Sequence, residues 1–221
     1  MITNFDFYTN SSNAVMNVNI GYPRGYGYLP LAPMQGTGSL QCEFLTNSLK
    51  GNVRPGASLV RGTNNGLIVT QVYAVQLTTP LAYAFGLYCM GSNTDLSSGI
   101  GNCYIFSLET AVNVYTAVIK KSTSGIGQSA FQTLSAVSAA AWAPNTSFFI
   151  ALSWVVSGAT ITLVGKTGFL TDYSDLSTIV SVVDSTSAFT SQSVGEGLWA
   201  DSSTNNNFRV QFDRSLWAGR V

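Results

Sequence analysis

Alternation of apolar and polar residues recurs along the chain and is clearest in the segment Ser193–Trp217. Its residues 208–213 (FRVQFD) alternate strictly, which is the pattern of a strand with one buried and one solvated face. The preceding residues 201–207 (DSSTNNN) have short polar side chains that favour turns. We therefore expect two strands joined by a polar loop, and we expect the last strand to close a sheet made earlier in the chain.

Further strand patterns follow one another from residue 39 onward. Leu67–Leu77 is an almost unbroken β-branched and aromatic run, which predicts a strand buried on both faces. Phe148–Val156 and Thr160–Val164 predict a hairpin around Ser157–Gly158. Other expected strands span residues 40–45, 57–61, 82–90, 103–108, 112–120 and 179–183. About ten to twelve short strands at this spacing are typical of an all-β sandwich or barrel.

Three segments interrupt this pattern. Ala130–Ala143 is rich in Ala, Leu and Gln and also carries β-branched and Ser residues, so both a helix and a strand stay open there. Residues 47–56 are rich in turn formers. Lys120–Gln128 (KKSTSGIGQ) predicts a turn or flexible tip, with its two lysines on a solvated loop edge.

The balance of charge limits the partners that the chain can have. Charged residues make up 9% of its 221 residues, against about 25% in an average soluble protein. Ten acidic residues balance ten basic ones, so nothing attracts nucleic acid or an anionic membrane. Weak charge repulsion favours association, and we expect much of the surface to lie against other chains.

The chain contains no histidine, which removes the commonest general base and the commonest transition-metal ligand. The three cysteines, Cys42, Cys89 and Cys103, have no metal-binding spacing. We expect them to be small buried hydrophobic residues, with a cross-strand pair of Cys89 and Cys103 as the alternative. We see neither a signal peptide nor a run long enough for a membrane span, and expect a protein made in the cytosol without membrane insertion.

The acidic residues are isolated from one another in the sequence. Glu196 and Asp201 are the least unsuitable pair for acid–base catalysis, and we predict no enzyme activity. Asp201 with residues 205–207, or Asp95 with Asn93 and Asn102, could supply calcium ligands. Neither group has the order of a calcium loop, so we interpret both as turn residues and predict no metal and no cofactor.

The first 38 residues differ in composition from the rest. Residues 1–20 are rich in Asn, Ser and Thr, and form either one or two short strands or an extended arm. Residues 21–38 (GYPRGYGYLPLAPMQGTG) contain three prolines, which exclude a central strand or helix. We predict an N-terminal arm over residues 1–38 and a β-sandwich domain over residues 39–221. The arm offers an interaction surface of aromatic and apolar side chains on a proline-fixed backbone: Tyr22, Tyr26, Tyr28, Leu29, Leu31 and Met34.

Carbohydrate recognition needs a planar ring beside carboxylate and amide groups. Trp199, next to Asp201 and Asn205, is the best local match in the sequence. We expect these three residues to form the glycan contact if one exists, with Tyr22, Tyr26 and Tyr28 as a second possibility. Trp142, Trp154 and Trp217 are expected to pack in a core or an interface.

The order of the strands resembles a known family. Residues 85–88 (FGLY) and 104–106 (YIF) resemble the central strands of concanavalin A-like (laminin G-like) jelly rolls. Residues 148–154 followed by 159–164 resemble a hairpin of those domains, and residues 194–199 with 207–213 resemble their closing pair. The resemblance covers about residues 57–217. It implies an all-β jelly-roll sandwich, to which the N-terminal arm is an addition.

The overall composition also resembles that of virion structural proteins. An Asn-, Ser-, Thr- and Gly-rich chain with little charge, no histidine and an aromatic Pro/Gly arm is similar to tailed-phage decoration (cement), tail and baseplate proteins. The resemblance implies a non-enzymatic virion protein that is assembled in the host cytoplasm, forms a homotrimer and contacts other virion proteins. The alternative is a carbohydrate-binding adhesion module that recognises host surface glycans.

Overall fold

The structure is a computed structural model of the chain. It describes the backbone of residues 2–5, 14–19, 27–29, 39–44, 49–55, 65–76, 82–91, 102–111, 114–123, 131–138, 146–170, 172–190, 197–202 and 208–220. Side chains are described for residues 65–73, 84–91, 102–110, 114–123, 131–138, 146–170 and 172–190.

The described residues form strands and contain no helix. The strands are β1 (Ile2–Phe5), β2 (Ala14–Asn19), β3 (Gly27–Leu29), β4 (Ser39–Phe44), β5 (Leu49–Pro55), β6 (Asn65–Gln76), β7 (Ala82–Cys89), β8 (Cys103–Ala111), β9 (Val114–Ser122), β10 (Phe131–Ser138), β11 (Ser147–Ser157), β12 (Thr160–Gly168), β13 (Ser177–Asp184), β14 (Gly197–Ser202) and β15 (Phe208–Arg220). No membrane-spanning helix is therefore found in the described part of the chain.

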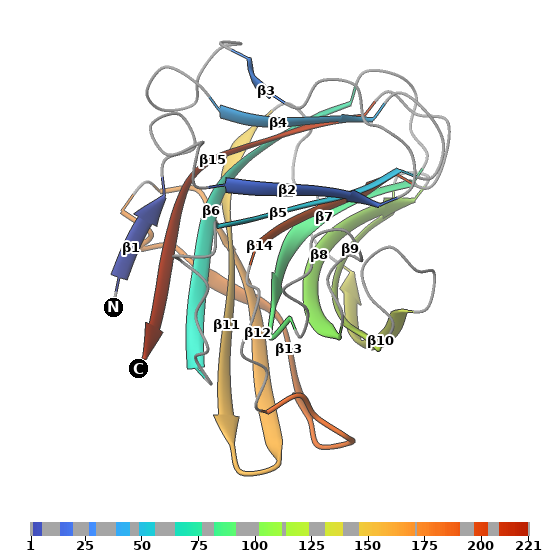
Figure 1. The fold of residues 1–221 in the computed structure, drawn as a ribbon, viewed down its shortest axis with the longest axis vertical. Helices are drawn as coiled ribbons and strands as arrows, with labels where there is room; N and C mark the ends of the chain where they lie inside the picture. Colours follow the sequence, from blue (N-terminus) through green and yellow to red (C-terminus); the bar gives the residue numbers. More distant parts are fainter. Residues whose placement is uncertain are drawn as a thin grey trace.

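The strands form two antiparallel sheets that face each other (Figure 1). The eight-stranded sheet has the order β13-β12-β11-β6-β15-β4-β3, and β1 also pairs with β15. The seven-stranded sheet has the order β10-β9-β8-β7-β14-β5-β2. The strands β7 to β10 and β11 to β13 are neighbours both in sequence and in a sheet, whereas β14 and β15 enter the middle of the two sheets.

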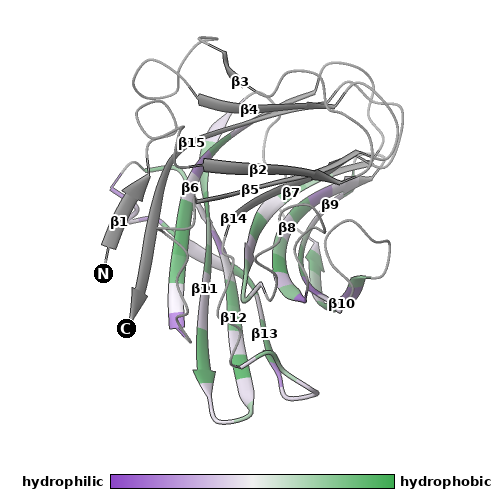
Figure 2. Cartoon of the chain, viewed as in Figure 1, coloured by the Kyte–Doolittle hydropathy of each residue, from purple (hydrophilic) through white to green (hydrophobic). Residues whose placement is uncertain are grey.

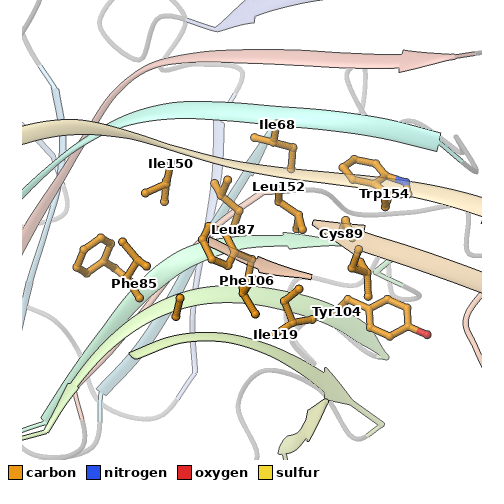
Figure 3. Packing of buried hydrophobic residues seen from close by; sticks show 14 of the residues in the cluster. Ile68, Phe85, Leu87, Cys89, Tyr104, Phe106, Ile119, Ile150, Leu152 and Trp154 are labelled. Atoms are coloured by element: carbon orange, nitrogen blue, oxygen red, sulfur yellow. The ribbon is translucent and has the colours of Figure 1, made fainter. Parts of the chain in front are cut away.

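The main core lies between the two sheets (Figure 3). Alternate residues of β7 and β8, such as Phe85, Leu87 and Phe106, pack against Ile150 and Trp154 of β11. In Figure 2 the hydrophobic segments accordingly concentrate on β6 to β9, β11 and β12. Trp154, at 1% exposure, is among the largest buried side chains, as the sequence predicted.

Two sequence predictions about the eight-stranded sheet are confirmed. Residues 68–72 of β6 are all buried, as expected for a strand covered on both faces. The predicted hairpin pairs Ser157 with Thr160 around a two-residue loop. Gly158 begins that loop with a φ of 60°, a conformation that favours glycine.

The two strands expected within Ser193–Trp217 are present, but they do not form the closing pair that the resemblance implied. β14 does not pair with β15 but lies between β5 and β7, whereas β15 lies between β4 and β6. The polar segment that joins them therefore connects the two sheets. Each strand gains two partners in this way, which satisfies more backbone groups than a hairpin at the edge would.

Three other segments differ from the sequence expectations. Of the two alternatives for Ala130–Ala143, a strand is present: β10 pairs with β9 and packs Leu134 against the main core. Residues 49–55 of the turn-rich segment form β5, since β2 and β14 pair with this strand on either side. The lysines at 120 and 121 are not on a solvated loop edge, because β9 continues to Ser122 and each ammonium group meets an acidic residue.

The segment predicted as an N-terminal arm contributes three strands to the sheets. β1 pairs with β15, β2 with β5 at one edge, and the three-residue β3 with β4 at another edge. Among the alternatives for residues 1–20, the short strands are therefore present. Of the predicted interaction residues, Tyr28 and Leu29 lie in β3 with their side chains outside the described residues, and Tyr22, Tyr26, Leu31 and Met34 lie wholly outside them. The division at residue 38 stays a prediction.

Candidate functional site

The candidate site lies on the face of the seven-stranded sheet that points away from the core, which we call the outer face. In β8, Tyr104, Phe106 and Leu108 belong to the main core. The residues between them, including Ser107 and Glu109, therefore belong to the outer face, because successive residues of a strand alternate between faces. Register partners on neighbouring strands share a face, so the pairing extends this assignment across the sheet.

One row of register partners crosses all seven strands and is polar at six of its seven positions. From β2 to β10 it runs Asn19, Lys50, Asp201, Ala84, Glu109, Thr116 and Ser138. We call this the polar row. Apart from one alanine, all its members are residue types with hydrogen-bonding side chains. Such a row across an outer face can form many hydrogen bonds with a polar ligand.

Glu109 is the charged member of the polar row whose surroundings are described. The Ser107 hydroxyl donates to Glu109 Oε1 at 2.6 Å. Lys120 Nζ lies 2.5 Å from the same oxygen and 5.7 Å from the centre of the Phe131 ring. The Glu109 side chain is 26% exposed and that of Lys120 16%. These contacts hold the carboxylate in one orientation at a surface that solvent reaches.

The adjacent part of the outer face is closed to solvent. Tyr88, Cys103 and Ile105 are fully buried and form a small hydrophobic cluster with Ala84. Gly86 is buried as well, and a Cβ atom there would overlap the carbonyl oxygen of Phe106. The accessible polar groups of the face therefore begin at the polar row.

The register places two of the predicted glycan-contact residues on this face. Asp201 pairs with Ala84 in the polar row, and Trp199 pairs with Gly86 in the next row. The side chains of both residues, and the whole of Asn205, lie outside the described residues. Gly86 and its other partner Ser107 are buried, so the row of Trp199 is the less accessible of the two. Sequence reasoning missed Glu109, although the alternation of residues 103–109 (CYIFSLE) already places it opposite the core residues.

A second polar group is buried between the sheets. Lys121 Nζ donates to Asp184 Oδ2 at 2.8 Å, and both side chains are 4% exposed. The same ammonium group donates to the carbonyl oxygens of Thr186, at 2.7 Å, and Ser187, at 2.9 Å. The Tyr104 hydroxyl donates to Asp184 Oδ2 at 2.7 Å. Because all three ammonium protons are used within the chain, this network ties β8 and β9 to the segment after β13 and has no donor left for a ligand.

The network shifts two side-chain pKa values. Burial alone would raise the pKa of Asp184, but hydrogen bonds from Lys121, from Tyr104 and from the N–H of Thr186 outweigh it and lower that pKa. Burial raises the pKa of Tyr104, and its hydrogen bond to Asp184 raises it further. The carboxylate is thus kept charged and the phenol neutral, as suits a structural network.

The acidic residues of the loop after β12 serve as caps. Asp175 Oδ2 accepts from the N–H of Phe169 at 2.6 Å, and Oδ1 accepts from the N–H of Leu170 at 3.0 Å. Asp172 accepts from the N–H and the hydroxyl of Ser174, which lower the pKa of its carboxyl. These acids therefore hold the turn rather than a substrate.

Neither described cysteine forms a disulfide, and the two lie on opposite faces of the seven-stranded sheet. Cys89 belongs to the main core and Cys103 to the cluster on the outer face. Burial raises the pKa of the Cys103 thiol strongly. Both are thus small buried hydrophobic residues, as predicted, and not a disulfide. The side chain of Cys42 lies outside the described residues.

Within the described residues, no group of three or more His, Cys, Asp or Glu side chains could hold a metal ion. Asp95, Asn93 and residues 205–207, from the calcium groups considered above, lie outside them, as does Glu196 of the acid pair.

Comparisons with known proteins define the fold. No protein-family model matches the chain, and no curated protein matches its sequence. Solved structures do match. Lectin II from Ulex europaeus is 11% identical with a TM-score of 0.58, over 100% of this chain and 99% of that chain. Basic winged bean lectin with Tn-antigen is 8% identical with a TM-score of 0.59, over 100% and 98%.

The similarity extends to a further solved structure. The exoplasmic/lumenal domain of VIP36 in its Ca2+/Man-bound form is 9% identical with a TM-score of 0.54, over 95% of this chain and 84% of that chain. At such identities the likeness is one of fold. The chain is an all-β jelly-roll β-sandwich of the concanavalin A-like class, as the sequence resemblance implied. Calcium is named for VIP36, whereas the described residues of this chain contain no metal-binding group of three or more His, Cys, Asp or Glu.

Proposed function

We propose that the protein binds carbohydrate, without a catalytic step, through the polar row on the outer face of the seven-stranded sheet. The observation that carries the proposal is the row itself, in which the strand pairing aligns polar residues of six strands with Ala84 of β7. Sugars are recognised by such groups, because each hydroxyl both donates and accepts hydrogen bonds. The lectins with the same fold support the same class of ligand.

The balance of charge favours carbohydrate binding over nucleic-acid binding. Nucleic acid requires a surplus of basic residues, whereas this chain has ten acidic and ten basic residues. The lysines of β9 are both paired with acids. A polar ligand with many hydroxyl groups matches a face of mixed and balanced charge.

The experiment is a glycan array followed by calorimetry, using the full chain. We expect binding of at least one class of glycan and a loss of affinity in the Asp201→Asn variant. Asp172→Asn is the matched control, because that acid lies on the loop after β12 and not on the seven-stranded sheet. A chain that binds no glycan on the array would overturn the proposal.

The virion structural role, the homotrimer and the location in a virion stay predictions from the low charge and the Asn/Ser/Thr/Gly-rich composition; none of the structural neighbours supports them. Mass spectrometry of purified particles would test them, with a simple ratio to the major capsid protein expected for a decoration protein. The Trp199→Ala variant separates the two functions. Lost glycan binding with an intact oligomer favours the lectin, and a lost oligomer favours the structural role.

A further inference from the structure

The two carboxylate oxygens of Glu109 have different surroundings. Oε1 accepts from the Ser107 hydroxyl and from Lys120 Nζ. Both contacts that the described residues make with this carboxylate use Oε1, and none of those residues occupies Oε2. Ser107 is fully buried, which fixes its position, and the carboxylate that it holds is therefore fixed as well.

The neighbourhood of Glu109 combines this acceptor with further polar and apolar groups. Thr116, its register partner on β9, is half-buried, and Ser138 beyond it on β10 is exposed. Val114 of β9, two residues from Thr116 on the same face, is 58% exposed. On the other side, Ala84 separates Glu109 from the position of Asp201, and two strand spacings amount to about 9.6 Å.

The charge at this place selects among ligands. A carboxylate accepts hydrogen bonds and repels other anions. The ammonium group of Lys120 already compensates the charge of Glu109, so the pair attracts free cations weakly as well. The groups that such a site binds best are neutral donors, which in a saccharide are the hydroxyl groups.

We infer that Glu109 is a ligand contact of the proposed carbohydrate site, that Ser107 and Lys120 are its positioning residues, and that the ligand is an uncharged saccharide whose hydroxyls donate to Oε2. This inference rests on the proposed function. It adds the residue that anchors the ligand and the charge class of that ligand.

The test compares neutral saccharides containing galactose, mannose or N-acetylgalactosamine with their sialylated or uronic acid counterparts, by calorimetry on the full chain. We expect the neutral compounds to bind more tightly. Glu109→Gln keeps the shape of the side chain and loses its charge. Affinity should fall about tenfold, because a hydrogen bond to a charged acceptor is roughly twice as strong as a neutral one. Asp172→Asn should leave affinity unchanged.

The positioning role of Ser107 can be tested separately, by comparing the binding affinities of single and double variants. Ser107→Ala should weaken binding less than Glu109→Gln, and the double variant should be no weaker than Glu109→Gln alone, because the serine acts through the carboxylate. Equal and additive effects would overturn this part. Should Glu109→Gln melt at a lower temperature, Glu109→Asp, which retracts the charge by one methylene, replaces it and should also weaken binding.

The outcomes separate the inference from the proposed function. Unchanged affinity in both Glu109 variants, or tighter binding of the anionic compounds, would overturn the inference and leave carbohydrate binding intact. If the unmodified chain binds no glycan, either on the array or in calorimetry, the proposed function fails and the inference fails with it.

Discussion

The buried network around Lys121 and Asp184 gives the most quantitative prediction. Asp184→Asn keeps the volume of the side chain, so no cavity forms, but the ammonium group of Lys121 loses its charged partner at 4% exposure. Leaving one charge of a buried pair uncompensated costs about 3–5 kcal/mol. That is a large part of the about 5–15 kcal/mol by which domains are stable.

Urea unfolding followed by tryptophan fluorescence measures this loss as a lower midpoint at an unchanged slope. Asp172→Asn, which changes an exposed acid, should leave the urea midpoint close to that of the unmodified chain. A Lys121→Met/Asp184→Asn double variant should lose less than the sum of the two single variants, because each single change removes the same pair. A loss below about 1 kcal/mol in Asp184→Asn would refute the reasoning, since that is the range of a solvent-exposed pair.

The same network predicts the direction of a pH effect. The pKa of Asp184 lies below its ordinary value of 3.8 in the folded chain. Its contribution is therefore fully present above pH 3.8 and is lost as the pH falls through the lower folded-state pKa. The difference in urea midpoint between the unmodified chain and Asp184→Asn should be constant near neutral pH and shrink in acid. A difference that grows in acid would contradict this sign.

Three further changes can be tested alongside. Gly86→Ala places a Cβ atom against the backbone carbonyl of Phe106 and should lower the free energy of unfolding by about 3 kcal/mol or more. A urea midpoint like that of the unmodified chain would count against the close approach of β7 and β8. Trp154→Ala removes a core side chain of 1% exposure and should cost about 3–5 kcal/mol in the same assay. The Cys103 thiol is buried with a raised pKa, so peptide mapping should find it unalkylated by iodoacetamide in the folded chain and modified in urea.

The fold was predictable from the sequence where a segment carries its own pattern. Strict alternation and a short turn defined the β11–β12 hairpin, and the β-branched run of β6 indicated burial on both faces. The strands β10 and β5 were harder to predict, because their local composition suits a helix or a turn. Their strand form depends on pairing with β9 and with β14, which local propensity does not contain.

The candidate site was predictable only in part, for a related reason. Trp199 and Asp201 were predicted as a glycan contact because an aromatic residue and an acidic residue lie close together in the sequence. Glu109 is remote from both in sequence and shares a row with Asp201 only through Ala84 of β7. The sequence likewise predicts a loop position for Lys120. Its place in β9 and its contact with Glu109 of β8 appear only in the structure. Register, which links residues far apart in the chain, is what the sequence alone does not supply.

The central positions of β14 and β15 have a consequence for synthesis on the ribosome. Before residues 197–220 emerge, the eight-stranded sheet lacks the strand that joins β6 to β4, and the seven-stranded sheet lacks the strand that joins β7 to β5. The nascent chain then holds two half-built sheets with unpaired inner borders, which are open to pairing with other chains. Completion of the sandwich is therefore a late event that awaits translation of these last strands, and a chaperone that shields nascent strands should raise the yield of folded protein.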